Sequence, residues 1–379
     1  MIPNTNEVRS RRVVHARARL GDVAQLYGGR SVVVSSSAGV AWATGGLSTP
    51  IDRVAASDPV WVVYRDGEIT LVTSSVECER LASEYPLDEL GLSMVAAPWY
   101  ENDAHERAVA RLVGDDVVSD VAGMGLDASF ELVRARLAMC GAELDVLHAL
   151  ASVATDAVEG VVGRWRPGEQ SDRDIASGVV QQLEGHGADA VCLIVGGDDR
   201  LRRFRHPMMR GDVPRDAVMV VVVARSLGLH VALTRLADVD DQRTRELMEK
   251  CEIVNEYVRD ATSVGATWGS VYTALGAGYR AVGQPDAWRE HFQGGPIGYA
   301  QREFELSPES SESPWWDEPL APGCAVAFNP SLSGGAKIED TYVLGEDSLT
   351  CATSTSRWPR LKGPASGAAV FRAREKKDT

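Results

Sequence analysis

Acid–base and anion-binding chemistry are the kinds of chemistry for which this chain offers suitable side chains. A histidine has an ordinary pKa of roughly 6.5, so it can take up and return a proton near neutrality. An arginine presents a rigid fork that matches a carboxylate in a bidentate manner. His206, within Phe204-Arg-His-Pro, and Glu339, within Ile338-Glu-Asp-Thr, are candidates of the acid–base type. The residues alone leave alternatives open, a turn cap for His206 and a solvated acid at a strand edge for Glu339.

Several other motifs with known chemistry are missing from the sequence. The six cysteines are scattered and form no CxxC pair, which argues against a zinc ribbon. Gly196-Gly-Asp-Asp lacks the lysine and the hydroxyl residue of a phosphate-binding loop, and no GxSxG motif occurs. We therefore expect no cofactor.

The overall charge and the apolar runs narrow the possible partners. The 39 basic and 54 acidic residues give a formal charge of −15, which argues against nucleic acid and acidic membrane surfaces. The N-terminus has no apolar signal core, and the longest apolar run, residues 217–224, is too short to span a membrane. We expect a cytoplasmic protein with no nucleic-acid or membrane partner.

The helices and strands that must position the candidate side chains are predicted to form two domains, because 379 residues are too many for one ordinary domain. In residues 1–140, strands and helices alternate, which predicts a small α/β domain: strands at 30–36, 60–64 and 69–73, and helices at 76–83 and 105–113.

The second part, residues 141–371, has two predicted helix pairs that alternate with strands, which indicates an α+β domain with an internal pseudo-repeat. The helices are expected at 142–164, from 171 onward, at 240–260 and at 267–282, and the later strands at 325–328, 338–344 and 349–352. Ser171 and Asp174 have the spacing of a capping box. The polar tail, residues 372–379, is predicted to be disordered.

Four segments resemble the creatinase, aminopeptidase P and methionine aminopeptidase family. They are Trp42-Ala-Thr-Gly-Gly with the later Asp52-Arg53, the run from Phe204-Arg-His-Pro to Arg235, Gly294-Gly-Pro-Ile-Gly, and Leu320-Ala-Pro-Gly with Ile338-Glu-Asp-Thr. The resemblance covers most of the chain. It implies a pita-bread C-terminal domain, a smaller creatinase-type N-terminal α/β domain, and a homodimer.

The sequence departs from the family at its metal site. The resemblance implies five ligands for two divalent ions, at the positions of Val221, Ala232, Gly295, Asn329 and Glu339. Only Glu339 is still a carboxylate, and a catalytic site needs about three protein ligands per metal. Asn329 is expected to donate a hydrogen bond into the vacated space, where a buried carboxylate would lack a compensating charge. We therefore predict an enzyme that works without a metal.

Creatinase is a metal-free member of this family, so the resemblance still implies catalysis. His206 stands at the position of its general base and acid, and Glu339 at that of an assisting carboxylate. Arg53 and Arg302 match the arginines that bind the substrate carboxylate, Arg53 across the dimer interface in that family. Thr234 stands where creatinase has a glutamate, which puts creatine in doubt as the substrate.

Further residues are placed at the site with weaker support. His291 occupies the position of a histidine near the leaving group in aminopeptidase P, and its alternative is a histidine at a helix end. His230 precedes the pocket-side Val231-Ala232 and could face either way. Glu303 is placed beside Arg302 among the substrate-binding residues, although Arg302 could also be a surface ion-pair partner of Glu303 or Glu305.

These observations lead to one principal hypothesis and two alternatives. The principal hypothesis is a metal-independent hydrolase or lyase that cleaves a C–N bond in a small, carboxylated, nitrogen-containing molecule, with a role in specialised metabolism. The first alternative is an inactive, peptidase-like module that binds a peptide or protein. The second, a residual metallopeptidase with an unusual ligand set, has the least support because so few ligands remain.

Overall fold

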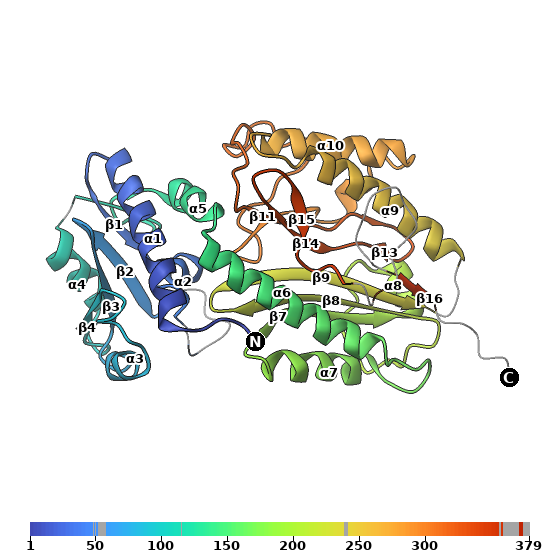
Figure 1. Ribbon diagram of the computed structural model, residues 1–379, viewed down its shortest axis with the longest axis horizontal. Helices are drawn as coiled ribbons and strands as arrows, with labels where there is room; N and C mark the ends of the chain where they lie inside the picture. The colour runs from blue at the N-terminus through green and yellow to red at the C-terminus, as the bar shows by residue number, and fades with distance from the viewer. Residues whose placement is uncertain are drawn as a thin grey trace. The chain divides into compact units, whose positions relative to one another are not determined.

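The structure is a computed structural model. It describes the chain apart from residues 48, 50, 52–57, 115, 239–241, 356–357, 359–370 and 374–379, and gives the backbone alone for 238 and 371–373. The chain divides into two compact units (Figure 1). Residues 3–146 with 227–229 form the N-terminal unit, and residues 1–2, 147–226 and 230–379 form the C-terminal unit.

The N-terminal unit is built around a mixed six-stranded sheet, in which β1 pairs antiparallel with β2 and parallel with β5. The strands in spatial order are β4 (Leu92–Ala97), β3 (Glu68–Ser74), β2 (Val60–Arg65), β1 (Ser31–Val34), β5 (Val117–Ser119) and β6 (Leu126–Asp127). The helices are α1 (Asn6–Leu26), α2 (Ser37–Ala43), α3 (Cys78–Glu84), α4 (Ala104–Val113) and α5 (Ser129–Leu137). This is the α/β domain that the sequence predicts.

Helix α1 is an element that the sequence pattern does not predict. It begins after Thr5, whose hydroxyl accepts a hydrogen bond from the amide of Val8. Its inner face buries two arginines, and Arg9 donates to the carbonyl of Gly46 while Arg12 donates to the carbonyl of Leu227. Charged residues on the buried face hide the apolar periodicity by which a helix is usually recognised.

The C-terminal unit contains two four-stranded sheets and a short hairpin. One sheet has the order β16 (Phe371–Ala373), β9 (Leu229–Asp238), β8 (Ala217–Ser226), β7 (Asp189–Gly197). The other has the order β10 (Gly294–Ile297), β11 (Ala325–Phe328), β14 (Asp340–Leu344), β15 (Leu349–Cys351). The hairpin joins β12 (Ser331–Leu332) to β13 (Ala336–Lys337).

Two pairs of helices cover these sheets in the C-terminal unit. Figure 1 shows α6 (Gly141–Val162) and α7 (Asp172–Glu184) beside strands β7 to β9, and α9 (Gln242–Ala261) and α10 (Trp268–Ala281) on the side of β11 and β14. The shorter α8 (Asp198–Arg203) and the 3-10 helix η1 (Ala287–Glu290) precede the loops of the candidate site. The predicted helix pairs and α+β class are confirmed.

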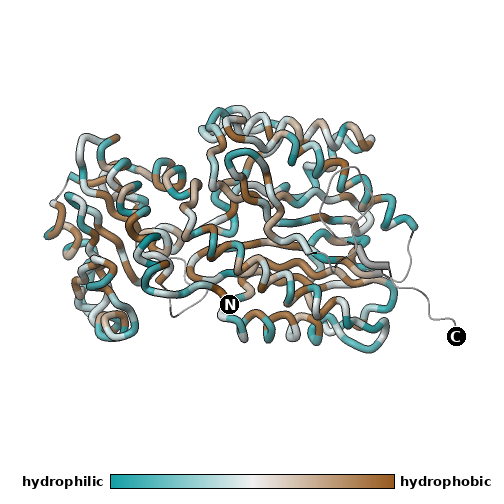
Figure 2. The backbone as a smooth tube through the Cα atoms, viewed as in Figure 1, coloured by the Kyte–Doolittle hydropathy of each residue, from teal (hydrophilic) through white to brown (hydrophobic). Residues whose placement is uncertain are grey.

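Hydrogen bonds join the two sheets of the C-terminal unit where the candidate site lies. The hydroxyl of Thr341 accepts from the amide of Ala232 at 2.8 Å and donates to its carbonyl at 2.9 Å. The amide of Thr234 donates to the carbonyl of Glu339 at 2.9 Å. Strands β7 to β9 carry long apolar stretches, whereas the covering helices mix polar and apolar residues (Figure 2), as a sheet covered on both faces requires.

The structure bears differently on three predicted boundaries: the start of a helix, the limits of the domains and the C-terminal tail. The capping box of Ser171 and Asp174 is present at the start of α7. Helix α6 contributes residues to both compact units, so the predicted limits of 1–140 and 141–371 stay a prediction. The predicted disordered tail lies outside the described residues, except that the backbone of 372 and 373 belongs to β16.

Among the described residues, no single helix has both the length and the apolar character needed to cross a membrane. Helices α5 and α6 meet these two requirements only when they are taken together, and the pair is bent by 76°.

Candidate active site

Two of the predicted catalytic histidines meet in the C-terminal unit. His206 lies in the loop between α8 and β8, and His291 lies between η1 and β10. Their Nε2 atoms are 3.0 Å apart, and their ring centroids are 4.8 Å apart with the planes inclined by 53°. The loop of His291 is held by Gln293, whose side-chain amide donates to the carbonyl of His291 at 2.7 Å. The two rings therefore form one hydrogen-bonded pair.

The neighbours of His291 determine which nitrogen carries each proton. Its Nδ1 contacts the carbonyl oxygen of Phe292, and a carbonyl can only accept. Nδ1 of His291 must therefore carry the hydrogen, which leaves its Nε2 as the acceptor in the neutral ring. Nε2 of His206 then donates to it, and Nδ1 of neutral His206 keeps the lone pair that a general base needs.

The surroundings favour the neutral form of both rings. Burial and, after it, the positive charge of Lys337 lower the pKa of His291 to about 3. Burial and Lys337 also lower the pKa of His206, against the opposing effect of the Glu339 carboxylate. Both histidines are accordingly unprotonated at pH 7, so His206 is ready to accept a proton.

Glu339 is buried and has a cationic partner that the sequence analysis missed. The ammonium of Lys337 lies 3.4 Å from Oε2 of Glu339, and the two side chains are 6% and 5% exposed. The hydroxyl of Thr234 donates to the same oxygen at 2.9 Å. Lys337 is the last residue of β13, and Glu339 lies two positions further on, just before β14. In extended chain, residues with this spacing point to the same side. That spacing was the available sequence signal.

Lys337 also faces the histidine pair. Lys337, His291 and Arg205 line one small pocket beside the hairpin β12–β13. Arg205 is held there by the carboxylate of Glu290 and by the hydroxyl of Ser333, which lies 3.1 Å away. The site thus combines two neutral imidazoles with a fixed positive charge, an arrangement that can accept a proton and stabilise negative charge.

A second, fully buried ion group supports the strands beneath Glu339. The guanidinium of Arg235 contacts Glu159 at 2.8 Å and Asp340 at 3.0 Å, and it donates to the carbonyl of Thr353 at 2.7 Å. Asp340, next to Glu339 in the chain, also accepts from the hydroxyl of Thr353 at 2.6 Å. These contacts fix the start of β14 and, with it, the position of Glu339.

The metal-ligand positions implied by the resemblance do not fit a pair of divalent ions. Val221 on β8 and Ala232 on β9 are buried and have no donor atom. The side-chain oxygen of Asn329 is buried without a hydrogen-bond partner among the described residues, and Glu339 is already paired with Lys337. One amide oxygen and one carboxylate cannot supply the ligands that two ions need.

Gly295 reinforces this result by steric means. A Cβ atom built at Gly295 would lie 2.5 Å from the hydroxyl oxygen of Tyr272. That hydroxyl is itself held in place, since it donates to the carbonyl of Gly294 at 2.5 Å. The histidine that the family has here cannot be accommodated unless Tyr272 moves.

The predicted substrate-binding residues differ in what they contact. Arg302 forms an ion pair with Glu305 at 2.9 Å, and its Nε is buried without a hydrogen-bond partner among the described residues. Glu303 accepts from the amide of Ala300 at 3.0 Å. Nδ1 of His230 lies 3.0 Å from the carbonyl of Gly298, so this buried ring tethers a loop. Arg53 lies outside the described residues.

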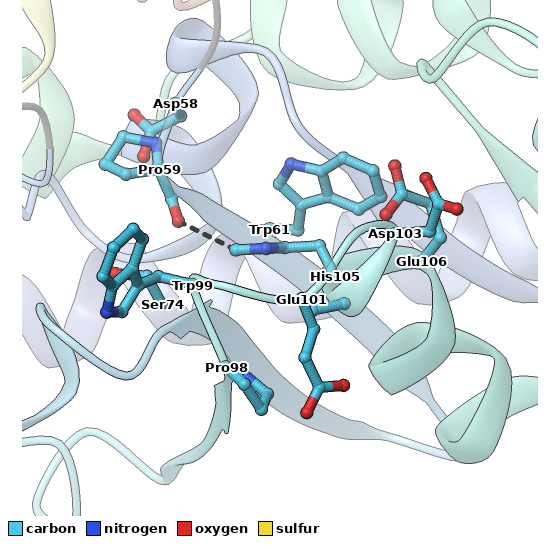
Figure 3. Close-up of a pocket in the computed structure, with 11 residues that line it drawn as sticks. Asp58, Pro59, Trp61, Ser74, Pro98, Trp99, Glu101, Asp103, His105 and Glu106 are labelled. Carbon is cyan, nitrogen blue, oxygen red and sulfur yellow. Dashed lines mark hydrogen bonds between the residues drawn. The ribbon is translucent and has the colours of Figure 1, made fainter.

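A separate hollow lies in the N-terminal unit (Figure 3). Two indoles and four carboxylates are among the side chains that line it: Trp61, Trp99, Asp58, Glu101, Asp103 and Glu106. Nε2 of His105 lies 3.3 Å from the carbonyl of Pro59 within it. None of the predicted site residues that the structure describes lines this hollow, so it takes no part in the catalytic argument.

Comparison with known proteins places the fold and the family. Residues 145–346 match the family Peptidase_M24, described as metallopeptidase family M24. The chain belongs to this family. The predicted family and pita-bread fold are thereby confirmed, and membership of a peptidase family supports a hydrolase. A comparison with curated proteins finds no match.

Solved structures show the same fold at low sequence identity. Dipeptidase PepE from Mycobacterium ulcerans is 18% identical with a TM-score of 0.73, covering 93% of this chain and 97% of that one. Xaa-Pro dipeptidase from Bacillus anthracis is 15% identical with a TM-score of 0.71, covering 95% and 100%. The N-terminal domain of the FACT complex subunit SPT16 from Cicer arietinum is 13% identical with a TM-score of 0.68, covering 92% and 97%.

Proposed function

We propose that this M24 family member is a metal-independent hydrolase that cleaves a C–N bond in a small, carboxylated, nitrogen-containing substrate. His206 is its general base and acid. The observation that carries the proposal is the buried pair of Lys337 and Glu339, 3.4 Å apart, beside the two histidines. In this arrangement a lysine ammonium stands next to the one carboxylate that remains of the family's ligand set.

Each residue has a defined part in the proposed reaction. Water attacks the carbon of the C–N bond while Nδ1 of His206 takes a proton from it. The C–N bond then breaks, and His206 passes that proton to the leaving nitrogen, so that OH is added to carbon and H to nitrogen. Such acid–base catalysis contributes about 10²–10⁴-fold to the rate.

His291 and Lys337 support this step without themselves taking part in the proton transfer. His291 accepts the hydrogen bond from Nε2 of His206 and so keeps the lone pair of His206 on Nδ1. Lys337 supplies positive charge that stabilises the negative charge developing on the attacking water as His206 takes its proton. Glu339, which accepts from the hydroxyl of Thr234, orients that ammonium. Preorganised charge of this kind is usually a large contribution to catalysis.

The remaining features of the proposal rest on the family resemblance. Arg302 gives up its ion pair with Glu305 and, together with Arg53, binds the substrate carboxylate. Three further residues shape the pocket around the substrate: Glu303, Asn329 and His230. We also propose a homodimer that works in the cytoplasm in specialised metabolism.

The test is a turnover screen with chelator-treated protein whose metal content has been measured. The panel contains carboxylated amidines, cyclic amidines and small amino-acid derivatives, and His206→Ala is compared with His186→Ala. His186 is an exposed histidine whose Nδ1 contacts the carbonyl of Gln182, away from the site, so it is the matched control. We expect turnover that survives chelation, remains in His186→Ala and decreases about 10²–10⁴-fold in His206→Ala. Turnover that requires added metal would contradict the proposal.

A binding module is the second candidate, favoured by the likeness in fold to a domain of the FACT complex subunit SPT16. In this case the site residues would be structural, and the chain would bind a peptide or protein without turnover. A panel without turnover, together with saturable peptide binding that is unchanged in His206→Ala, would support this alternative.

A further inference from the structure

Three side chains with metal-binding atoms meet in the N-terminal unit, away from the candidate active site. His15 lies on α1, Cys140 lies immediately before α6, and Glu143 lies in the first turn of α6. One ligand atom from each of them lies within 4.8 Å of the other two. Among the described residues, this is the group of histidine, cysteine and carboxylate side chains that meets such a distance test.

The individual contacts show that the cluster is compact. Nδ1 of His15 lies 3.1 Å from Oε2 of Glu143. The amide of Cys140 donates to the same oxygen at 2.7 Å, so this carboxylate is fixed at the start of the helix. The sulfur of Cys140 lies within 4.8 Å of the ligand atoms of His15 and Glu143, which places the thiol beside the imidazole as well.

These separations are close to those of a tetrahedral zinc site. With Zn–N and Zn–O bonds of about 2.1 Å and a Zn–S bond of about 2.3 Å, tetrahedral ligands lie roughly 3.4–3.7 Å from one another. The ligand atoms of the cluster therefore need to move by about 1 Å at most. Side-chain rotations on α1 and at the start of α6 can supply such a movement without a change of fold.

Burial and charge also suit a cation at this point. The Glu143 side chain is 1% exposed and that of His15 is 21% exposed. A buried carboxylate requires a positive partner, and a divalent ion bound by all three side chains would supply one. Imidazole and thiolate bind such an ion through the atoms that otherwise carry protons, so the ion would compete with protons for His15 and Cys140.

We propose that His15, Cys140 and Glu143 bind one zinc ion, with water as the fourth ligand, and that the ion ties α1 to the start of α6. The combination of thiolate, imidazole and carboxylate selects zinc over magnesium or calcium, which prefer sites made only of oxygen. The site is independent of the proposed function, because it uses none of the residues assigned to catalysis.

The experiment is a titration of the chelator-treated full chain with cobalt(II), followed by competition with zinc. A thiolate ligand gives cobalt(II) a near-ultraviolet charge-transfer band, which reports the metal–sulfur bond directly. We expect one equivalent to bind with this band, zinc to displace it, and zinc to raise the melting temperature. In Cys140→Ser the band disappears, and zinc binds more than about 100-fold more weakly.

Two control variants make the result specific. Cys78 is a half-buried cysteine of the same unit. Cys192 is a half-buried cysteine of the other unit, and burial and then the charge of nearby Glu339 raise the pKa of its thiol. Cys78→Ser and Cys192→Ser are expected to keep the band. A band that disappears in Cys192→Ser would place the metal near the candidate active site and overturn the proposal.

The remaining outcomes also decide the matter. His15→Gln is the second variant, and circular dichroism establishes that it and Cys140→Ser are folded. Loss of the band in both folded variants supports the site. A wild-type protein that shows no band and no zinc-dependent melting shift would overturn it and leave His15 and Glu143 as an ion pair only.

Discussion

Glu339 in the C-terminal unit and Glu143 in the N-terminal unit are both buried carboxylates with one cationic neighbour. For Glu339 the neighbour is the ammonium of Lys337 at 3.4 Å, and for Glu143 it is the imidazole of His15 at 3.1 Å. Around Glu339, the positions that hold metal ligands in the resembling family carry Val221, Ala232 and other residues unsuited to metals. Around Glu143, a thiol and an imidazole remain available.

The difference shows that a buried carboxylate does not by itself make a metal site. The ammonium of Lys337 has no lone pair with which to bind a metal, so it can balance the charge of Glu339 but cannot itself act as a ligand. A histidine can exchange its proton for a metal, because the nitrogen that loses the proton is itself a ligand. The two units therefore balance a buried carboxylate with different cations, of which only the histidine can itself become a metal ligand.

Arg235 is a buried cation with a purely structural role, against which Lys337 and His15 can be compared. Its replacement is expected to have the largest effect on the free energy of unfolding. Arg235→Met leaves Glu159 and Asp340 buried without their shared partner. Breaking a buried ion group in this way costs about 5 kcal/mol. The free energy of unfolding in urea measures it. A loss below about 1 kcal/mol would show that the two carboxylates are protonated or solvated in the native protein.

Lys337→Met tests whether Lys337 stands in for a metal. We expect the variant to lose turnover and about 3 kcal/mol of the free energy of unfolding, because Glu339 keeps its hydrogen bond from Thr234 but loses its counter-charge. The double variant Lys337→Met with Glu339→Gln should recover much of this stability, because it removes both charges.

Metal binding by the same variant sharpens the comparison further. Lys337→Met should not gain affinity for zinc in the C-terminal unit, since the other positions still lack ligands. If zinc restored the turnover of Lys337→Met, a metal would fit this site after all, and the contrast between the two units would fail.

His291→Gln is expected to change the pH dependence of stability by a smaller amount. The pKa of His291 is about 3 in the folded protein and 6.5 ordinarily, so below pH 6.5 the unfolded chain binds a proton that the folded chain does not. This destabilises the native protein increasingly until the pH reaches about 3. Between pH 6.5 and about pH 5 the wild type should lose about 2 kcal/mol more than His291→Gln.

Urea unfolding at several pH values measures this difference, with His186→Gln as the exposed control. Parallel curves for the wild type and His291→Gln would mean that His291 titrates normally and is not held neutral by burial and Lys337.

Much of the fold could be predicted from the sequence because it rests on local signals and on the order of motifs. The helix expected at 267–282 is α10, and the capping box at Ser171 starts α7 as its spacing indicates. Helix α1 could not be found in this way, because Arg9 and Arg12 lie on its buried face and bond to backbone carbonyls from distant segments.

The candidate site was predictable in its residue types and less so in its contacts. The motifs led to His206, His291 and Glu339 separately. The 3.0 Å contact between the two histidines joins residues 85 positions apart, and a single sequence carries no signal for such a contact. Lys337 stands at none of the family's ligand positions, so the motifs that led to Glu339 gave no indication of its partner.

The hydroxyl of Tyr272 has a consequence for the engineering of this protein. It occupies the volume that a side chain at Gly295 would need, 2.5 Å from where the Cβ would lie. Gly295→His therefore requires the side chain of Tyr272 to move, because the two side chains need the same volume. Tyr272→Phe removes the hydroxyl together with its hydrogen bond to Gly294, so any attempt to introduce a histidine at position 295 should begin with that substitution.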